Sequence, residues 1–438
     1  MYDRFYSNDN LRRFKESIGQ ADWSDVYNCQ DPNISFKRFM KVLLMKFDEN
    51  IPLQCKKSRS SKKIPKSPWV TKSLLRSINR KNNLYYKYKT NPTDILKRKY
   101  TTYKNVLTSL LRSEKKMYFC RQLDNFKNNS KHTWNVINDI LNKNKEKPQI
   151  SSINNNGHTL KDPCDIAESF NNYFSHIGIN LANNIPPSNR HFTDFLNEPH
   201  PSSLFFEPVD EAEILNIVNN LDNKKSCGHD GINNIVLKCV ISEIVQPLAH
   251  VFNLSISSGI VPDDMKLAKV IPIFKKGDEK ETSNYRPISL LTCFSKILEK
   301  VIYSRTIDFL QHQNIFFDFQ FGFREKHNTT HAILTLVDKI TRASDQHCHT
   351  LGVFLDFSKA FDTINHDILL YKLSHYGIRG KALEWFRNYL QNRKQYVSVQ
   401  NKISSTQDIN CGVPQGSLLG PLLFIIYIND FHKSSLRL

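Results

Sequence analysis

The sequence predicts an α+β protein: a mainly helical, basic N-terminal region followed by a region of short strands and helices. Apolar residues recur at helical spacing between residues 69 and 182, whereas short apolar runs separated by turns appear after residue 205. The positive charge is confined to one block, because residues 51–147 hold 25 Lys and Arg against 5 Asp and Glu. Such a block is typical of a protein that binds a phosphate backbone, although a solvated linker would have the same composition.

The first 68 residues contain few apolar positions. Val42, Leu43 and Phe47 fall near helical spacing, which predicts a helix over residues 36–47. Residues 52–68 are rich in Pro, Ser and Lys, with almost nothing to bury, and are predicted to be a flexible basic linker.

Helices are predicted from Trp69 onward. The first ends at Asn91, because the residue before a proline is pushed out of the helical region. Two more are expected over residues 95–126 and 134–141. Lys97, Arg98 and Lys99 are the candidate nucleic-acid contacts. The tyrosines of these helices suit either base stacking or a seam between helices, and the sequence does not decide between the two.

Residues 153–160 predict a β-hairpin around Gly157, and residues 166–182 predict an amphipathic helix. The expected domain boundaries are 1–68, 69–204 and 205–438. The nine cysteines include no C-x-x-C pair, which favours a reducing, intracellular compartment, nuclear or cytoplasmic. No secretory signal is visible, and the apolar run 418–428 is too short for a membrane span, so it is interpreted as a core segment and no membrane association is expected.

A basic hairpin is predicted over residues 269–291. Val270, Ile271 and Ile273 form a short strand, and a Lys-Lys-Gly-Asp turn leads to a second extended run. Arg286 can hold phosphate oxygens with two parallel hydrogen bonds and Lys275 can act as a point charge. An ordinary surface hairpin is the alternative. Residues 223–238 carry a weaker signal for a phosphate loop, for which a turn before a helix is the simpler interpretation.

The run GVFLDF, residues 352–357, predicts a buried strand that carries Asp356 at its end. Asp362 and Asp367 are interpreted as helix-start residues for a helix over 363–373. The sequence GVPQG at 412–416 predicts a turn that opens a helix over residues 417–427.

These segments occur in one order: IPIFKKGDEKETSNYRPISLL, FQFGFREKHNTTHAI, FLDFSKAFDTINH and GVPQGSLLGPLLFIIYINDF. Together they resemble the reverse transcriptase of a non-LTR, LINE-type retrotransposon of the jockey or CR1 kind, over at least residues 205–438. The resemblance implies the fingers and part of the palm of a right-hand polymerase. It also implies that residues 1–68 follow an endonuclease, and that 69–204 form an extension binding template RNA or target DNA.

The resemblance further implies that the reaction is RNA-templated DNA synthesis from deoxynucleoside triphosphates at a DNA primer. It assigns Asp356 and the Phe357 carbonyl to a Mg²⁺ (or Mn²⁺) site and Phe361 to the aromatic gate under the sugar. Gln415 and Gly416 would lie against the nucleotide and template.

The family's second carboxylate motif, aromatic-x-Asp-Asp, does not occur in these 438 residues. We therefore expect that this chain is truncated before that motif and is inactive alone, since one carboxylate cannot hold two metals. The alternative hypotheses are a retained nucleic-acid-binding protein on an inactive polymerase scaffold, and a domesticated polymerase that copies DNA or uses no template.

Overall fold

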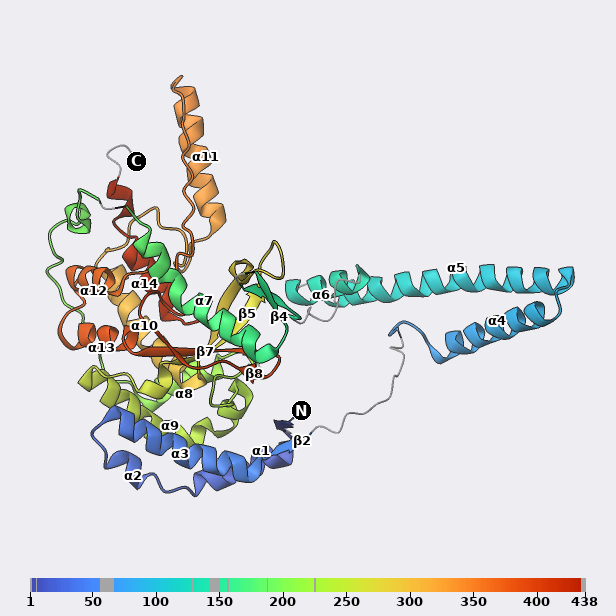
Figure 1. The fold of residues 1–438 in the computed structure, drawn as a ribbon, viewed down its shortest axis with the longest axis horizontal. Coiled ribbons are helices and arrows are strands. Elements are labelled where there is room, and N and C mark those ends of the chain that lie inside the picture. Colours follow the sequence, from blue (N-terminus) through green and yellow to red (C-terminus); the bar gives the residue numbers. More distant parts are fainter. Residues whose placement is uncertain are drawn as a thin grey trace. The chain divides into compact units, whose positions relative to one another are not determined.

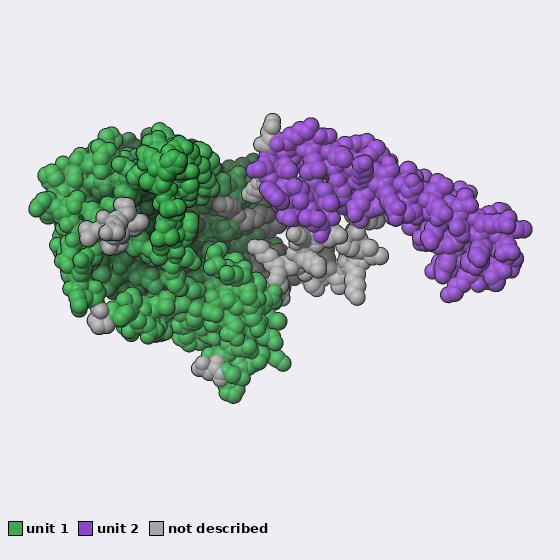
Figure 2. All heavy atoms as spheres, turned by 90° about the horizontal axis from the view of Figure 1, so that it is seen from above, with its two compact units in different colours: residues 1–55, 150–438 green, residues 56–149 purple. Residues whose placement is uncertain are grey.

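The computed structural model describes residues 2–4, 6–55, 67–127, 129–141, 150–155, 157–186, 188–223 and 226–434. The chain divides into two compact units (Figures 1 and 2). Unit 1 combines residues 1–55 with residues 150–438, and unit 2 comprises residues 56–149. The expected boundaries at residues 68 and 204 do not coincide with this division. Most of the predicted linker, residues 56–66, lies outside the described residues.

The N-terminal residues belong to the core of unit 1 and are not merely a connection. Helices α1 (Asn8–Gly19), α2 (Ser24–Tyr27) and α3 (Pro32–Asn50) pack on α9 (Asn234–Ser258). The predicted helix over 36–47 is confirmed, and Asp31 caps its start by accepting a hydrogen bond from the Ile34 amide. Its buried face, including Phe39, contacts the Phe294 ring at 5.5 Å. Strand β1 (Tyr2–Arg4) pairs with β2 (Leu53–Cys55).

A five-stranded sheet lies at the centre of unit 1. Its order is β6-β5-β7-β8, and β9 also pairs with β7. The predicted hairpin is confirmed, because β5 (Leu267–Phe274) and β6 (Tyr285–Leu290) pair antiparallel. The other strands are β7 (Arg393–Val399), which runs parallel to β5, β8 (Lys402–Ile403) and β9 (Gln407–Ile409).

Helix α7 (Pro163–Asn183) covers one face of this sheet (Figure 1). It confirms the helix predicted over residues 166–182. Phe170 and Phe174 are buried against the sheet, and the Phe170 ring meets the Tyr285 ring at 4.9 Å. The small hairpin β3 (Ile153–Asn155) and β4 (His158–Leu160) precedes α7, as predicted.

Helices form the larger core of unit 1, which buries more than fifty apolar side chains. Helix α9 is long and apolar enough to cross a membrane, but 61% of that stretch is buried inside the protein, as in an ordinary core helix. The remaining elements are α8 (Glu211–Asn219), α10 (Cys293–His312), α11 (Thr329–Asp345), α12 (His366–His375), α13 (Gly380–Leu390) and α14 (Leu419–Tyr427), with short 3-10 turns η1 (Phe192–Phe195), η2 (Asp263–Met265), η3 (Thr282–Asn284) and η4 (Phe431–Ser434). Helix α11 has no buried residue and projects from the unit (Figure 1).

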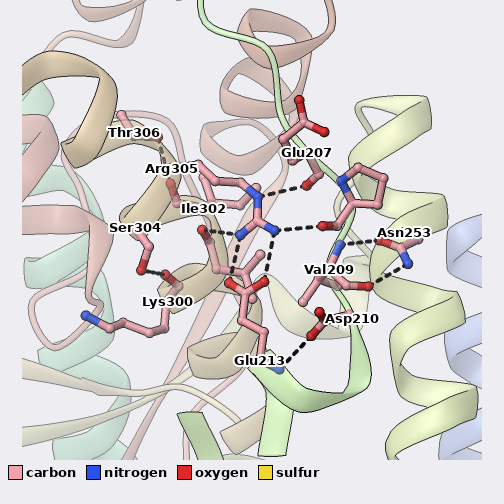
Figure 3. A network of polar contacts seen from close by, with 12 residues as sticks. Glu207, Val209, Asp210, Glu213, Asn253, Lys300, Ile302, Ser304, Arg305 and Thr306 are labelled. Atoms are coloured by element: carbon pink, nitrogen blue, oxygen red, sulfur yellow. Dashed lines mark hydrogen bonds and ion pairs between the residues drawn. The ribbon is translucent and has the colours of Figure 1, made fainter. Parts of the chain in front are cut away.

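Arg305 joins α10 to α8 and to the segment before it (Figure 3). Its guanidinium donates to both carboxylate oxygens of Glu213, at 2.8 and 2.9 Å. The same group donates to the carbonyls of Glu207, Pro208 and Val301. The N–H groups of the planar Arg305 guanidinium are therefore all used, and they connect two helices and a loop.

Unit 2 contains α4 (Lys72–Thr90), α5 (Asp94–Asn125) and α6 (Ser130–Ile140), which confirm the three predicted helices. Helices α4 and α5 pack together. The rings of Tyr88 and Tyr100 stack at 6.4 Å across their seam, and Tyr85 meets Tyr100 at 5.4 Å. Tyr88 and Tyr100 therefore follow the helix-seam alternative, whereas Tyr85 and Tyr86 are 43% and 64% exposed.

Candidate nucleotide site

The β5–β6 hairpin presents two of the predicted phosphate contacts. Lys275 follows β5, and its backbone amide donates to the Asn284 carbonyl at 2.9 Å, which closes the hairpin end. Arg286 lies in β6 opposite Ile273. Both cations are exposed, so they are available to a ligand.

A turn over residues 358–363 brings a third cation to the hairpin. The Lys359 ammonium donates to the Ser283 carbonyl at 3.4 Å. Burial lowers the pKa of Lys359, and the charges of Lys275 and Arg286 lower it further, while Asp362 opposes both effects. Lys275 and Arg286 therefore both lie within electrostatic range of Lys359. Sequence reasoning missed Lys359, because only the fold places its turn beside the hairpin.

The GVPQG loop is tied to this turn and to β6 by backbone hydrogen bonds. The Val413 amide donates to the Phe361 carbonyl and the Ser289 amide donates to the Gln415 carbonyl, each at 2.8 Å. Gly412 and Gly416 have φ values of 82° and 125°. A Cβ atom at Gly416 would lie 2.6 Å from the Ser289 carbonyl oxygen, so this close approach requires glycine.

Asp362 does not start a helix, contrary to the sequence interpretation. Asn365 caps α12 instead, and Asp367 lies in the first turn of that helix, as expected. The Asp362 carboxylate accepts hydrogen bonds from Gln415 Nε2 at 3.2 and 3.3 Å. Burial raises the pKa of Asp362 to about 6, against the opposing charge of Lys359. A group whose pKa is shifted by burial and a specific partner is a candidate functional residue.

Phe361, the predicted aromatic gate, belongs to this turn and packs on α14. Its ring meets Phe424 of α14 at 5.2 Å and Phe323 at 5.8 Å. Phe361 is only partly buried. The ring packing holds Phe361 against α14, and its role as an aromatic gate stays a prediction.

The buried strand predicted for residues 352–357 is absent, and this expectation was wrong. None of these residues belongs to a strand, and Val353 and Phe354 are 68% and 85% exposed. An apolar run becomes a buried strand only when neighbouring strands pair with it, and no strand within the described residues does so. Phe357 nevertheless packs on the rings of Phe424 and Phe431.

Asp356 is consequently exposed and unsupported by a sheet. Its carboxylate and the Phe357 carbonyl are oxygen donors of the kind Mg²⁺ prefers. Across the described ranges, however, no three His, Cys, Asp or Glu side chains gather where they could hold a metal ion. The residues at hand therefore do not complete a two-metal site.

A buried carboxylate, Glu299 of α10, fixes the start of α14 directly after the GVPQG loop. It accepts hydrogen bonds from the Leu418 amide at 2.7 Å and from the Tyr389 hydroxyl at 2.9 Å. Burial raises the pKa of Glu299, while these hydrogen bonds and the charge of Arg393 lower it. Sequence reasoning missed Glu299, because its partners come from distant segments.

The sequence predicted two further sites. Lys97, Arg98 and Lys99 are exposed on α5 of unit 2. In the weaker candidate loop, Asn233 caps α9, and Asp230 accepts a hydrogen bond from the Ile232 amide at 3.2 Å. This arrangement agrees with the simpler interpretation of a turn before a helix, although residues 224–225 of that loop lie outside the described residues.

The end of β5, all of β6, the turn over residues 358–363 and the GVPQG loop fall within the range that one family model matches. Residues 273–437 match the family model described as reverse transcriptase (RNA-dependent DNA polymerase). The match agrees with the resemblance that the motifs predicted for this part of the chain.

The chain is also similar to curated RNA-directed DNA polymerases from transposons and mobile elements. The chain is 34% identical over 54% of its length to the "Probable RNA-directed DNA polymerase from transposon BS" of Drosophila melanogaster. It is 33% identical over 55% of its length to the "RNA-directed DNA polymerase from mobile element jockey" of the same species. Each match covers 26% of the relative, so the chain spans about a quarter of these proteins. A weaker match, 27% identical, covers 68% of the chain and 27% of a "Putative 115 kDa protein in type-1 retrotransposable element R1DM".

Proposed function

We propose that this chain supplies the nucleotide-binding fingers and part of the palm of a polymerase that copies RNA into DNA. The observation that carries the proposal is that Lys275 and Arg286 lie within electrostatic range of Lys359, whose turn also carries Asp362, the hydrogen-bond partner of Gln415. The cations would receive the triphosphate. Phe361, Gln415 and Gly416 would line the sugar and base of an incoming deoxynucleotide.

A divalent cation, Mg²⁺ or Mn²⁺, would supply the charge neutralisation that phosphoryl transfer needs. Asp356 and the Phe357 carbonyl would contribute to its site. Because the described residues do not complete that site, no step of the reaction is derived through the metal. Residues 1–438 by themselves are expected to bind nucleotide without extending a primer.

Nucleotide binding tests the proposal directly. Fluorescence titration with a labelled dATP and Mg²⁺ should show a Kd that rises about tenfold in Lys275→Ala, Arg286→Ala or Lys359→Ala, since a charge-assisted hydrogen bond contributes about 1.5–3 kcal/mol. Lys402→Ala, an exposed lysine on β8, is the matched control and should bind like the unmodified protein. Equal affinities for all four variants would overturn the proposed triphosphate site.

The alternative of a retained nucleic-acid-binding protein is favoured by one observation, the exposed Lys97, Arg98 and Lys99 on α5. RNA template and DNA primer are the expected partners in either case. The dATP titration distinguishes the two functions, because a protein that only binds nucleic acid does not need Lys275, Arg286 and Lys359 to bind a triphosphate. RNA binding with no detectable dATP binding would favour this alternative.

A further inference from the structure

The contact between Asp362 and Gln415 fixes the direction of an amide. An ionised carboxylate only accepts hydrogen bonds, so the amide group that faces Asp362 must be the NH₂ group of Gln415. Both contacts involve Gln415 Nε2, at 3.2 and 3.3 Å. The oxygen Oε1 is therefore turned away from the carboxylate.

The backbone around this contact leaves little else to adjust. The loop is held on one side by Phe361, through the Val413 amide, and on the other by Ser289. Helix α7 closes the opposite side of the turn, because a Cβ atom at Gly178 would lie 2.1 Å from the Asp362 carbonyl oxygen. The main chain is therefore held on both sides of the contact between Asp362 and Gln415. The orientation of the Gln415 side-chain amide is then set by its contact with Asp362.

We propose that Asp362 is a positioning residue whose carboxylate holds Gln415 Oε1 towards the nucleotide site, as an acceptor for a hydrogen-bond donor on the sugar or base. This role rests on the proposed function, in which Gln415 contacts the incoming deoxynucleotide. A protonated Asp362 carries a donor of its own and no longer excludes the flipped amide. Nucleotide binding should then depend on the ionisation of Asp362.

The surroundings of Asp362 shift its pKa into the pH range in which binding can be measured. Burial raises its pKa to about 6. Lys359 faces it from the same turn, Tyr173 from α7 and Cys411 from the GVPQG loop. Lys275 and Arg286 act on Lys359 in turn. Lys359 favours the carboxylate, and neither the Tyr173 phenol nor the Cys411 thiol is expected to ionise below pH 8, because burial raises the pKa of both.

The first test measures the contact itself. In protein labelled with ¹⁵N-glutamine, the side-chain amide signal of Gln415, assigned by its loss in Gln415→Met, should shift with pH and show a midpoint near 6. In Asp362→Asn the midpoint should vanish. A Gln415 signal that does not titrate, or titrates equally in Asp362→Asn, would overturn the proposal.

The second test measures the consequence for binding. The Kd for dATP with Mg²⁺ should rise between pH 8 and pH 5 in both the unmodified protein and Asp362→Asn. The rise should be about tenfold larger in the unmodified protein, because only about a tenth of its Asp362 is ionised at pH 5. Comparing the two proteins cancels the effect of pH on the nucleotide's own phosphates, because that effect is the same for both. Asp362→Glu, which keeps a carboxylate, should retain a pH dependence, and its thermal melt checks folding. Identical pH profiles for Asp362→Asn and the unmodified protein would contradict the proposal. If dATP binds at no pH, the proposed function fails, while the amide titration still decides the role of Asp362 towards Gln415.

Discussion

A buried ion pair beneath the segment that carries Asp356 offers a quantitative test of the structure. The Lys372 ammonium donates to Asp430 Oδ1 and, at 2.7 Å, to the Tyr427 carbonyl. The two charged side chains are only 7% and 6% exposed. The Lys372→Met substitution keeps much of the side-chain volume but leaves the Asp430 carboxylate buried without its cation.

Breaking a buried pair by removing one partner costs about 3–5 kcal/mol of unfolding free energy, because the remaining charge has lost its compensation. Removing both charges, with Lys372→Met and Asp430→Leu together, should recover most of that loss. The chain supplies a matched control in Lys381 and Glu384, which form an ion pair at 2.6 Å with side chains 65% and 56% exposed. Lys381→Met should cost less than about 1 kcal/mol.

Urea denaturation followed by the fluorescence of Trp385, a fully buried side chain of unit 1, measures all four proteins. A lower midpoint at constant slope reports the loss of stability. The reasoning is refuted if Lys372→Met and Lys381→Met lower the midpoint equally, since burial would then make no difference to the pair. It is also refuted if the double variant is less stable than Lys372→Met.

Three other outcomes are expected. Arg305→Lys should lower the unfolding free energy by about 1–3 kcal/mol, because a lysine cannot reproduce the two-oxygen contact; an unchanged urea midpoint would contradict this. Replacing Lys97, Arg98 and Lys99 by Gln should reduce the salt slope of single-stranded RNA binding by up to about 2, and an unchanged slope would show that these residues are only solvated. Asp362→Asn should gain about 1.4 kcal/mol relative to the unmodified protein between pH 5 and pH 8. The raised pKa means that folded Asp362 holds its proton more tightly than unfolded Asp362, so the cost of ionising it in the folded protein grows as pH rises through 6. A stability difference that does not change over this range in urea titrations would contradict the burial of Asp362.

Local pattern was sufficient to predict the long helices and the first hairpin. Helices α3, α5 and α7 follow from apolar spacing and from the residues that cap them, which are properties of a single segment. The β5–β6 hairpin follows in the same way, because its two strands and its turn are adjacent in the chain. The fold class and the similarity to reverse transcriptases were therefore predictable from sequence.

The failures share one cause, which is dependence on partners remote in sequence. The run 352–357 has strand composition, but pairing is a property of its neighbours. The apolar positions of α1–α3 show that these helices bury a face without showing that α9 covers it. Asp362, Lys359 and Glu299 carry no local signal, because their partners, Gln415, Ser283 and Leu418, are brought to them only by the tertiary fold.

The discontinuity of unit 1 has a consequence for how the protein is made. Helices α1–α3 bury their apolar face against α9, yet all of unit 2 and the sheet-covering helix α7 are synthesised in between. At about 5–20 residues per second, a ribosome completes α9 roughly ten to forty seconds after α3. For that interval α3 has no α9 to pack against, and Phe36 and Phe39 also lack Phe294 of α10. The first segment of unit 1 therefore cannot complete its packing until α9 has been synthesised, and its apolar face stays without that partner in the meantime.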